Sequence, residues 1–221
     1  MITLFDYLPS QNGWKVRQLL HHLETPYRTE IVGIFQGEGQ SSDYLEVNPW
    51  GAVPAIRLED GRVLSESNAI LWYLSADTPY RRNDAFAQAK VLQWLSFEAD
   101  YVQSSMGSLR YWTLTGKLPA RPRSLIDGKR ATAIRALDIL NRELSARPFI
   151  AGDYSIADIS LFAYAHLAGD AGIPTAHLSA FERWVARVRG QNRFLAEMYP
   201  YSIDPHSANN VELHIAESGL L

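Results

Sequence analysis

The stretch that decides the fold is residues 48–74, which read NPWGAVPAIRLEDGRVLSESNAILWYL. Pro54 is typical of the first residue or the edge of a strand. Asp60-Gly61 lies between two apolar runs, which is a strong short-range signal for a β-hairpin. Apolar residues at helical spacing follow Ser67. The stretch therefore predicts a turn, a strand, a tight turn, a second strand and a helix.

Two features of this stretch could bind a ligand. A cis Val53-Pro54 bond would turn the backbone of Val53 outward as an edge for a peptide-like molecule. Glu66-Ser67 at a helix start combines a carboxylate, a hydroxyl and free backbone N–H groups, which suits a zwitterionic amino-acid head group. The alternative is that Pro54 is an ordinary trans turn proline and that the serines only cap the helix.

Composition and charge narrow the class of protein. The chain has 221 residues, 47% of them hydrophobic, which is enough for one large or two small domains with a substantial core. The net charge is −3 and no basic stripe appears, which argues against nucleic acid as a partner. The chain has no cysteine, which excludes disulfides, cysteine–zinc sites and a cysteine nucleophile.

Neither a membrane span nor a metal site is expected. Residues 1–6 lack the basic start and apolar core of a signal peptide, and no apolar run approaches the roughly eighteen residues of a spanning helix. His21 and His22 are adjacent on a predicted helix and point about 100° apart, which makes them a poor metal pair. We therefore expect a cytoplasmic protein without a metal ion.

The first third of the chain alternates strands and helices. Residues 2–5 read as a strand, a helix begins at about Gly13, and residues 27–32 read as a second strand. With the stretch 48–74, the order is β-α-β, a loop, and β-β-α. The βαβ unit favours a parallel pair of strands and the hairpin an antiparallel pair. The sequence therefore predicts a mixed four-stranded sheet.

The rest of the chain reads as all-helical. The expected helical segments are 86–114, 124–145, 156–169, 179–189 and 192–199. Ser155 and Asp158 are spaced as a capping box, which we interpret as structural. We therefore expect an α+β protein of two domains, at 1–76 and 85–200, with a tail at 201–221.

A mixed βαβ-ββα domain followed by an all-helical domain, with Val53-Pro54, Glu66-Ser67 and residues 155–158 at these separations, resembles the cytosolic glutathione transferases. The resemblance covers nearly the whole chain. It implies a thioredoxin-like glutathione-binding domain, an all-α bundle that lines the acceptor site, and a homodimer. In that family the proline that matches Pro54 is cis.

Two short motifs point to one branch of that family. Residues 10–16, SQNGWKV, resemble the Thr/Ser-Pro-Asn-Gly-x-Lys-Val loop of the bacterial Nu-class and yeast-prion-like branch. Residues 37–40, GEGQ, resemble its glycine-flanked glutamine. The chain departs by carrying Gln11 in place of the proline and Ser10 where threonine is common. This branch is linked to disulfide-bond reduction. The resemblance therefore slightly favours reduction over conjugation.

Ser10 and Asn12 are the expected catalytic residues. A thiol ordinarily titrates near pH ~8.5, so thiolate formation at neutral pH requires stabilisation of the anion. Hydrogen-bond donors at a helix start, with the helix dipole, supply it, and lowering the pKa by one unit takes only about 1.4 kcal/mol. By residue type alone, without the resemblance, turn and N-cap roles are favoured for both residues. Tyr7 is the competing thiolate donor, which we expect instead to pack or to line the site.

The resemblance also implies how the rest of glutathione is held. The backbone of Val53, before Pro54, pairs with the cysteinyl unit, Glu66 and Ser67 hold the γ-glutamyl end, and Gln40 reaches the glycyl end. Glutathione is thus the cosubstrate.

Further contacts are open at this stage. Lys15 and Trp14 are near enough in sequence to contribute, although Lys15 is equally consistent with a solvated helix charge. Arg135 could contact glutathione or the partner subunit. An aromatic stripe at helical spacing is more often core than pocket. With that alternative open, the candidates for the acceptor site are Tyr7, Tyr101, Ser105, Met106, Leu109, Tyr111 and Trp112.

The expected function is that of a glutathione-dependent transferase, which conjugates glutathione to an electrophile or uses it to reduce a disulfide or peroxide. The alternative is a non-catalytic glutathione-binding or interaction protein of the same fold, since fold alone does not decide function. A thioredoxin-type oxidoreductase that uses its own thiols is excluded by the absence of cysteine.

Overall fold

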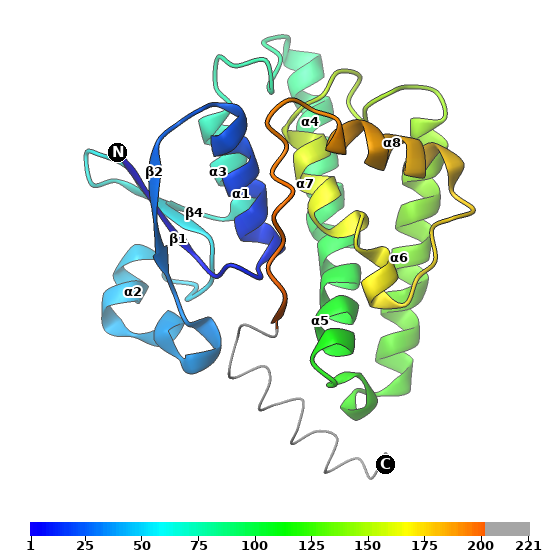
Figure 1. Ribbon diagram of the computed structural model, residues 1–221, viewed down its shortest axis with the longest axis horizontal. Helices are drawn as coiled ribbons and strands as arrows, with labels where there is room; N and C mark the ends of the chain where they lie inside the picture. The colour runs from blue at the N-terminus through cyan, green and yellow to red at the C-terminus, as the bar shows by residue number, and fades with distance from the viewer. Residues whose placement is uncertain (202–221) are drawn as a thin grey trace.

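A computed structural model describes residues 1–201 of the chain, so the tail expected at 201–221 lies outside the described residues apart from Tyr201. Figure 1 shows two parts of the molecule. One part contains the sheet and the helices that cover it, and the other is a group of longer helices. An extended segment runs between the two parts (Figure 1).

The sheet is mixed and four-stranded, as the sequence predicts. Its strands are β1 (Ile2–Asp6), β2 (Tyr27–Ile31), β3 (Ala55–Arg57) and β4 (Val63–Ser65), in the order β2-β1-β3-β4. Strand β1 runs parallel to β2 and antiparallel to β3, and β3 and β4 form the predicted hairpin. Gly61 in the tight turn has a φ of 85°, a conformation that glycine adopts without steric cost.

Three helices cover the sheet: α1 (Gln11–His22), α2 (Ser42–Val47) and α3 (Ser67–Leu74). Successive side chains of a strand point to opposite faces. Leu4 accordingly packs with α1 and α3 on one face, and Phe5 packs with α2 on the other. The loop after β2 contains two short 3-10 turns, η1 (Ile34–Gln36) and η2 (Glu38–Gln40).

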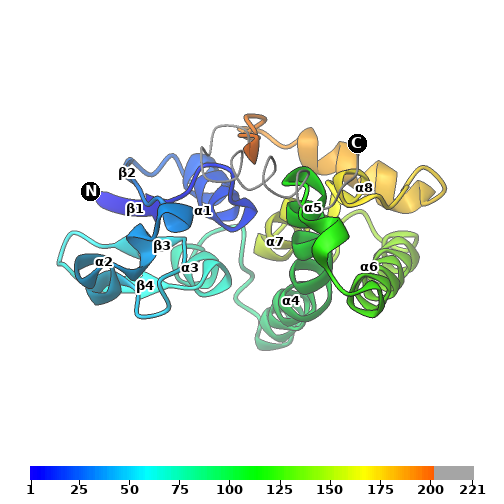
Figure 2. The ribbon, with the colours of Figure 1, turned by 90° about the horizontal axis from the view of Figure 1, so that it is seen from below.

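The second part of the chain is helical up to about residue 190. The predicted long helix is continuous, but it consists of α4 (Ala85–Phe97), a π-helical stretch η3 (Glu98–Gly107) and α5 (Ser108–Leu114). The other helices are α6 (Arg123–Leu144), α7 (Ile156–Ala165) and α8 (Ser179–Arg189), with 3-10 turns at Leu118–Ala120 and Ala168–Ala171. Helix α7 packs against α1, and α4 and α8 pack against α7 (Figures 1 and 2).

The predicted capping box is present at the start of α7. The Ser155 hydroxyl accepts from the N–H of Ala157 at 3.3 Å, and the Asp158 carboxylate accepts from the N–H of Ser155 at 3.1 Å. Asp158 also accepts from Trp184 Nε1 at 2.9 Å, which ties α7 to α8. Burial raises the pKa of Asp158 to about 6, against these hydrogen bonds. The box is thus buried among core contacts.

The prediction of a helix at 192–199 is wrong. This segment, which we call the C-terminal strap (residues 192–201), is extended except at its two ends, and runs between α1 and α7 (Figure 1). Side chains of α1 take its backbone groups: Trp14 Nε1 and Gln18 Nε2 donate to the carbonyls of Leu195 and Arg193 at 3.1 and 3.2 Å. Since these groups bond to α1, they are not available for bonds within a helix.

Candidate functional site

Ser10 ends the loop between β1 and α1, and Asn12 is the second residue of α1. Helix α1 begins two residues earlier than predicted because Ser10 is its N-cap, with the hydroxyl accepting from the N–H of Gly13 at 3.3 Å. A Cβ at Gly13, the third residue of α1, would lie 1.8 Å from Oδ1 of the buried Asp6, so this position favours glycine. Ser10 and Asn12 therefore lie at the positive end of a twelve-residue helix.

A buried ion pair holds the loop between β1 and α1 in place. Asp6 is fully buried and pairs with Arg17, which also donates from Nη2 to the carbonyl of Leu8 at 3.0 Å. The N–H of Tyr7 donates to Asp6 Oδ1 at 2.8 Å. Burial raises the pKa of Asp6, and the Arg17 guanidinium opposes that rise. The path of the chain between β1 and Ser10 is thus fixed by contacts with charged groups.

The start of α3 meets the start of α1. Ser67, the first residue of α3, is buried and donates from its hydroxyl to Asn12 Oδ1 at 3.3 Å. Glu66 precedes it with a φ of 70°, a conformation uncommon outside glycine, and its side chain is exposed. Two helix N-termini and their polar residues therefore face the same region, which suits an anionic ligand.

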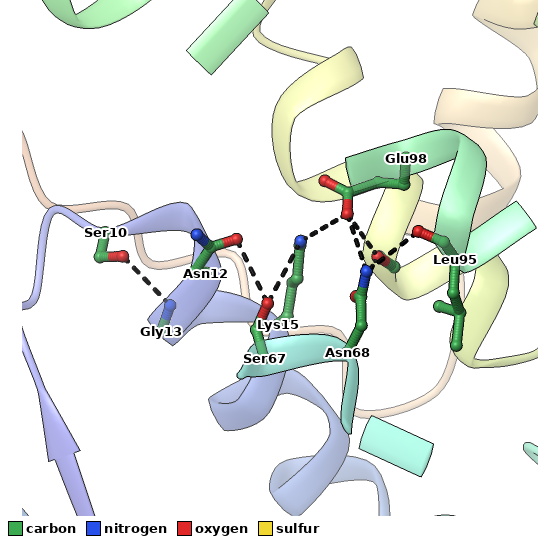
Figure 3. A network of polar contacts seen from close by, with 9 residues as sticks. Ser10, Asn12, Gly13, Lys15, Ser67, Asn68, Leu95 and Glu98 are labelled. Carbon is green, nitrogen blue, oxygen red and sulfur yellow. Dashed lines mark hydrogen bonds and ion pairs between the residues drawn. The ribbon is translucent and has the colours of Figure 1, made fainter. Parts of the chain in front are cut away.

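Lys15 is not a solvated helix charge. Its Nζ lies 2.9 Å from Glu98 Oε2, and both side chains are fully buried (Figure 3). Lys15 Nζ also donates to the hydroxyl of Ser67 at 3.5 Å. Burial lowers the pKa of Lys15, and the nearby carboxylate of Glu98 acts against that lowering. Lys15 thus reaches from α1 to the start of α3 and to η3 of the helical part.

Residues that the sequence reasoning missed complete this network. Asn68 Nδ2 and the Ser160 hydroxyl both donate to Glu98 Oε2, at 3.1 and 3.2 Å, and the Ser160 hydroxyl is also 2.6 Å from Asn68 Oδ1. Asn68 directly follows Ser67, so its position next to a predicted site residue could have identified it from the sequence. Glu98 and Ser160 lie far along the chain, and no local pattern marks them.

The Val53-Pro54 peptide bond is cis, in agreement with the expectation from the resemblance. Ala55 pairs with both Phe5 and Ser65, so the two residues before it lie between the ends of β1 and β4. This position places Val53 between the loop of Ser10 and the start of α3.

Gln40 lies at the outer side of the same region. It ends the η2 turn and is exposed. A Cβ at Gly51 would lie 2.2 Å from Gln40 Nε2, so the Gln40 side chain rests on the loop that leads to Val53. Gln40 therefore lies against the loop that precedes Val53.

Some acceptor-site candidates belong to the core. Met106 and Leu109 are 1% and 0% exposed within the main cluster of the helical part, so their prediction as lining of an open pocket is wrong. Ser105 is buried and donates to the carbonyl of Tyr101. The stripe to which these residues belong is covered by neighbouring helices, which a helical spacing alone cannot distinguish from a pocket. Trp112 packs partly buried against the same cluster.

Two candidates lie on the outer surface. Tyr101 is 47% exposed on η3, and Arg135 is exposed on α6. Figure 2 shows α6 on the far side of the helical part from α1. Within one subunit, Arg135 therefore does not join the group around Ser10 and Ser67.

Aromatic side chains connect the two parts of the molecule near the loop of Ser10. Phe35 of η1 stacks on Tyr111 of α5, with ring centroids 5.3 Å apart and planes 2° apart. Tyr7 contacts Phe35 edge-on at 5.4 Å, and Tyr201 contacts Tyr111 at 5.4 Å. We call these four residues the aromatic bridge. Tyr7 therefore packs, as expected, and Phe35 is a contact that sequence reasoning missed.

A groove of about 830 Å³ lies between α3 and α4. Its lining is largely apolar but includes Glu66 and Asn68. The other lining residues include Leu64, Ala69, Trp72, Tyr73, Leu92 and Leu95.

Two properties of the described part of the chain bear on ligand class. Within residues 1–201, no group of three or more His, Cys, Asp or Glu is arranged to hold a metal ion. Across the same residues, no helix combines the length and the apolar character needed to cross a membrane.

Known proteins match this arrangement. The family model described as glutathione S-transferase, N-terminal domain, matches residues 9–77. The disulfide-bond oxidoreductase YfcG of Escherichia coli K12 is 28% identical over 202 residues, which cover 86% of this chain and 91% of that protein.

Two solved structures are similar over most of their length. A glutathione S-transferase from Pseudomonas fluorescens superposes with a TM-score of 0.85 at 32% identity, over 88% of this chain and 97% of that chain. A glutathione transferase from Burkholderia graminis, with two glutathione molecules bound per subunit, has a TM-score of 0.74 at 25% identity, over 96% and 87%.

Proposed function

The chain belongs to the glutathione S-transferase family, and we propose that it binds glutathione as a thiolate for attack on a disulfide or another electrophile. The observation that carries the proposal is the meeting of two helix N-termini, α1 and α3, at Ser10, Asn12 and Ser67. Backbone N–H groups and polar side chains at such ends stabilise an anion.

In this proposal Ser10 and Asn12 stabilise the sulfur anion. The Ser10 hydroxyl accepts from Gly13 and keeps its hydrogen for a donor role. Asn12 Oδ1 accepts from Ser67, which leaves the amide N–H groups to donate. One charge-assisted hydrogen bond is worth about 1.5–3 kcal/mol, enough to lower a thiol pKa by one to two units. Neither residue needs to remove the proton as a base.

The remaining assignments follow the resemblance to the glutathione transferases. The backbone of Val53, held by the cis bond to Pro54, pairs with the cysteinyl unit. Glu66 and Ser67 bind the γ-glutamyl end, and Gln40 binds the glycyl end. Residues 1–76 would form this binding domain, and residues 85–200 the domain that lines the acceptor site.

We place the chain in the Nu-class, yeast-prion-like branch and favour disulfide reduction over conjugation. The loop 10–16 and the similarity to a disulfide-bond oxidoreductase support this choice. With no cysteine in the chain, the electrons must come from glutathione. The thiolate would attack one sulfur of the disulfide, form a mixed disulfide and release a thiolate, which takes up a proton. A second glutathione would then release the other thiol and leave as oxidised glutathione.

The second substrate would approach along the aromatic bridge. Tyr111 and Phe35 present flat apolar surfaces near the loop of Ser10, and Lys117 Nζ donates to the Tyr111 hydroxyl at 2.6 Å. Tyr7, which is buried, packs against Phe35 from the side of the sheet.

The proposed enzyme is a homodimer that joins at the groove between α3 and α4. Tyr73 and Leu92 line this groove and are 44% and 45% exposed, and Trp72 and Leu95 extend its apolar surface. A second copy would cover them. Arg135 of one subunit would then contact the partner subunit or the glutathione bound to it. Light scattering tests this assembly. We expect the molar mass of a dimer for wild type and of a monomer for Leu92→Glu, because the charged side chain would be buried at the interface.

Steady-state turnover tests the proposed function. A small glutathione-mixed disulfide and a generic aryl halide are compared as substrates, with wild type and the double variant Ser10→Ala/Asn12→Ala, and calorimetry measures glutathione affinity. We expect disulfide turnover to dominate and to be lost in the variant while binding persists. Dominant aryl conjugation would overturn the reductase assignment, and tight binding without turnover of either would indicate an interaction protein.

A further inference from the structure

Lys15 reaches the glutathione site from within the protein. It lies three residues after Asn12 on α1, and its side chain is fully buried between α1, α3 and η3. An ammonium group can only donate hydrogen bonds. The contact of 3.5 Å between Lys15 Nζ and Ser67 Oγ is therefore a donation to the serine oxygen. This leaves the Ser67 hydroxyl hydrogen to point elsewhere.

That hydrogen points at Asn12. Ser67 Oγ is 3.3 Å from Asn12 Oδ1, so the amide oxygen of Asn12 faces α3. The amide nitrogen must then face the opposite side, and Figure 3 shows it on the side of Ser10. The two contacts together give one consistent direction, from the Lys15 ammonium to the Ser67 hydroxyl and from that hydroxyl to Asn12 Oδ1. The Asn12 amide nitrogen is thereby left to donate on the side where Ser10 lies.

Glu98 holds Lys15 in this role. Its Oε2 accepts from Lys15, Asn68 and Ser160 at 2.9–3.2 Å, so its position is fixed from three elements. Glu98 Oε1, in contrast, is buried without a hydrogen-bond partner among residues 1–201. A buried ion pair is often no more stabilising than a well-packed apolar pair. An imperfectly satisfied pair at this place therefore points to a role beyond stability.

Other charged or titratable groups near Lys15 do not replace this pair. Glu66 contributes a weaker electrostatic attraction than Glu98, and Tyr164 presents its ring 5.6 Å from Lys15 Nζ. Burial raises the pKa of Tyr164, so the ring stays neutral.

We propose that Lys15 is a positioning residue that holds Ser67, and through it Asn12, so that the Asn12 amide nitrogen is aimed at the sulfur of bound glutathione. The catalytic half of this inference rests on the proposed function. Without the donation from Lys15, Ser67 is free to reverse its hydrogen bond and Asn12 to rotate. The sulfur then loses one of two donors, which raises the pKa of bound glutathione by about one unit and lowers its thiolate fraction about tenfold below that pKa.

The test uses the double variant Lys15→Met/Glu98→Gln. It removes both charges and so leaves no buried ion without a partner, while the amide oxygen of the new glutamine side chain still accepts from Asn68 and Ser160. The matched control is Gln18→Met. Gln18 is also fully buried on α1, but its amide bonds to the C-terminal strap and not to Ser67.

The first measurement needs no ligand. The NMR signal of the Asn12 side-chain amide, assigned by its loss in Asn12→Ala, is compared among the three proteins. We expect it to shift or broaden in the double variant and to stay unchanged in Gln18→Met. An unchanged Asn12 signal in the double variant would overturn the positioning role, whatever happens to stability.

The second measurement is the pKa of bound glutathione, from the ultraviolet absorbance of the thiolate against pH. We expect a rise of about one unit in the double variant and none in Gln18→Met. Affinity for S-methylglutathione, which has no thiol, should change less than about threefold in either. A thiol pKa that stays at the wild-type value although the Asn12 signal moves would overturn the catalytic half.

Failure of the proposed function gives a different result. A wild type that does not bind glutathione, or that binds it without lowering the thiol pKa, overturns the proposed function and the catalytic half with it. The Asn12 signal then still decides whether Lys15 holds that side chain.

Discussion

The inner and outer ends of the proposed glutathione site are built in different ways. At the inner end, Asn12 and Ser67 are fixed by the buried charges of Lys15 and Glu98, which come from both parts of the molecule. At the outer end, Gln40 lies exposed in a short 3-10 turn. Under the proposed function, we expect the inner end to govern the chemistry of the sulfur and the outer end to add affinity.

The largest effect is expected from breaking the inner end at Glu98. Glu98→Ala leaves the Lys15 ammonium buried without its partner, which should lower the free energy of unfolding by about 3–5 kcal/mol. Urea denaturation measures this loss. The control is Asp153→Ala, which breaks an exposed ion pair with Arg82 and should cost less than about 1 kcal/mol. Equal losses in the two variants would contradict the special status of the inner end.

The packing beside the inner end should also make the protein sensitive to acid. His166 stacks on Phe162 at 3.9 Å and lies near Trp14 of α1. Burial lowers the pKa of His166 to about 4, from an ordinary value of 6.5. The unfolded chain therefore binds a proton between these values while the folded protein does not. Stability from this group is complete above pH 6.5 and is lost as the pH falls to about 4, by up to about 3 kcal/mol.

His166→Phe tests this prediction. The phenyl ring keeps the stack on Phe162 but cannot take up a proton. Tm measured between pH 4 and 7 should fall less steeply in His166→Phe than in wild type. Parallel curves for the two proteins would show that His166 does not carry the acid sensitivity.

Sequence reasoning succeeded where the signal was local. The hairpin at Asp60-Gly61 and the capping box at Ser155 each occupy a few consecutive residues, and their conformation follows from those residues. The start of α1 was placed two residues late, at about Gly13, because Gln11 and Asn12 were assigned to the preceding loop. Local patterns thus determine most elements of the fold.

The same reasoning failed where distant segments decide. The role of Lys15 stayed open between a site contact and a surface charge because its partner Glu98 is on another helix. Phe194, Leu195 and Met198 have helical spacing, yet they contact the core from an extended strap. A periodic stripe shows that one face is covered but not what covers it.

Asn12→Ala tests the inner end directly. The loss of one donor to the thiolate should lower kcat about 10–100-fold, which corresponds to about 1.4–2.7 kcal/mol, and should leave the KM for glutathione nearly unchanged. Steady-state kinetics separate the two parameters. Asn83→Ala, at an exposed asparagine before α4, is the control and should match wild type. If Asn12→Ala changes only KM, Asn12 contacts the peptide part of glutathione rather than its sulfur.

The smallest effect is expected at the outer end. Gln40→Ala removes one exposed hydrogen bond, worth about 0.5–1 kcal/mol, so the KM for glutathione should rise about two- to fivefold without a change in kcat. Substrate truncation identifies the contact. γ-Glutamylcysteine lacks the glycyl unit, so wild type and Gln40→Ala should use it with the same KM. If Gln40→Ala weakens γ-glutamylcysteine as much as glutathione, Gln40 acts on the loop before Val53 rather than on the glycyl end. The outer end would then also position the site, and its contrast with the inner end would be one of degree.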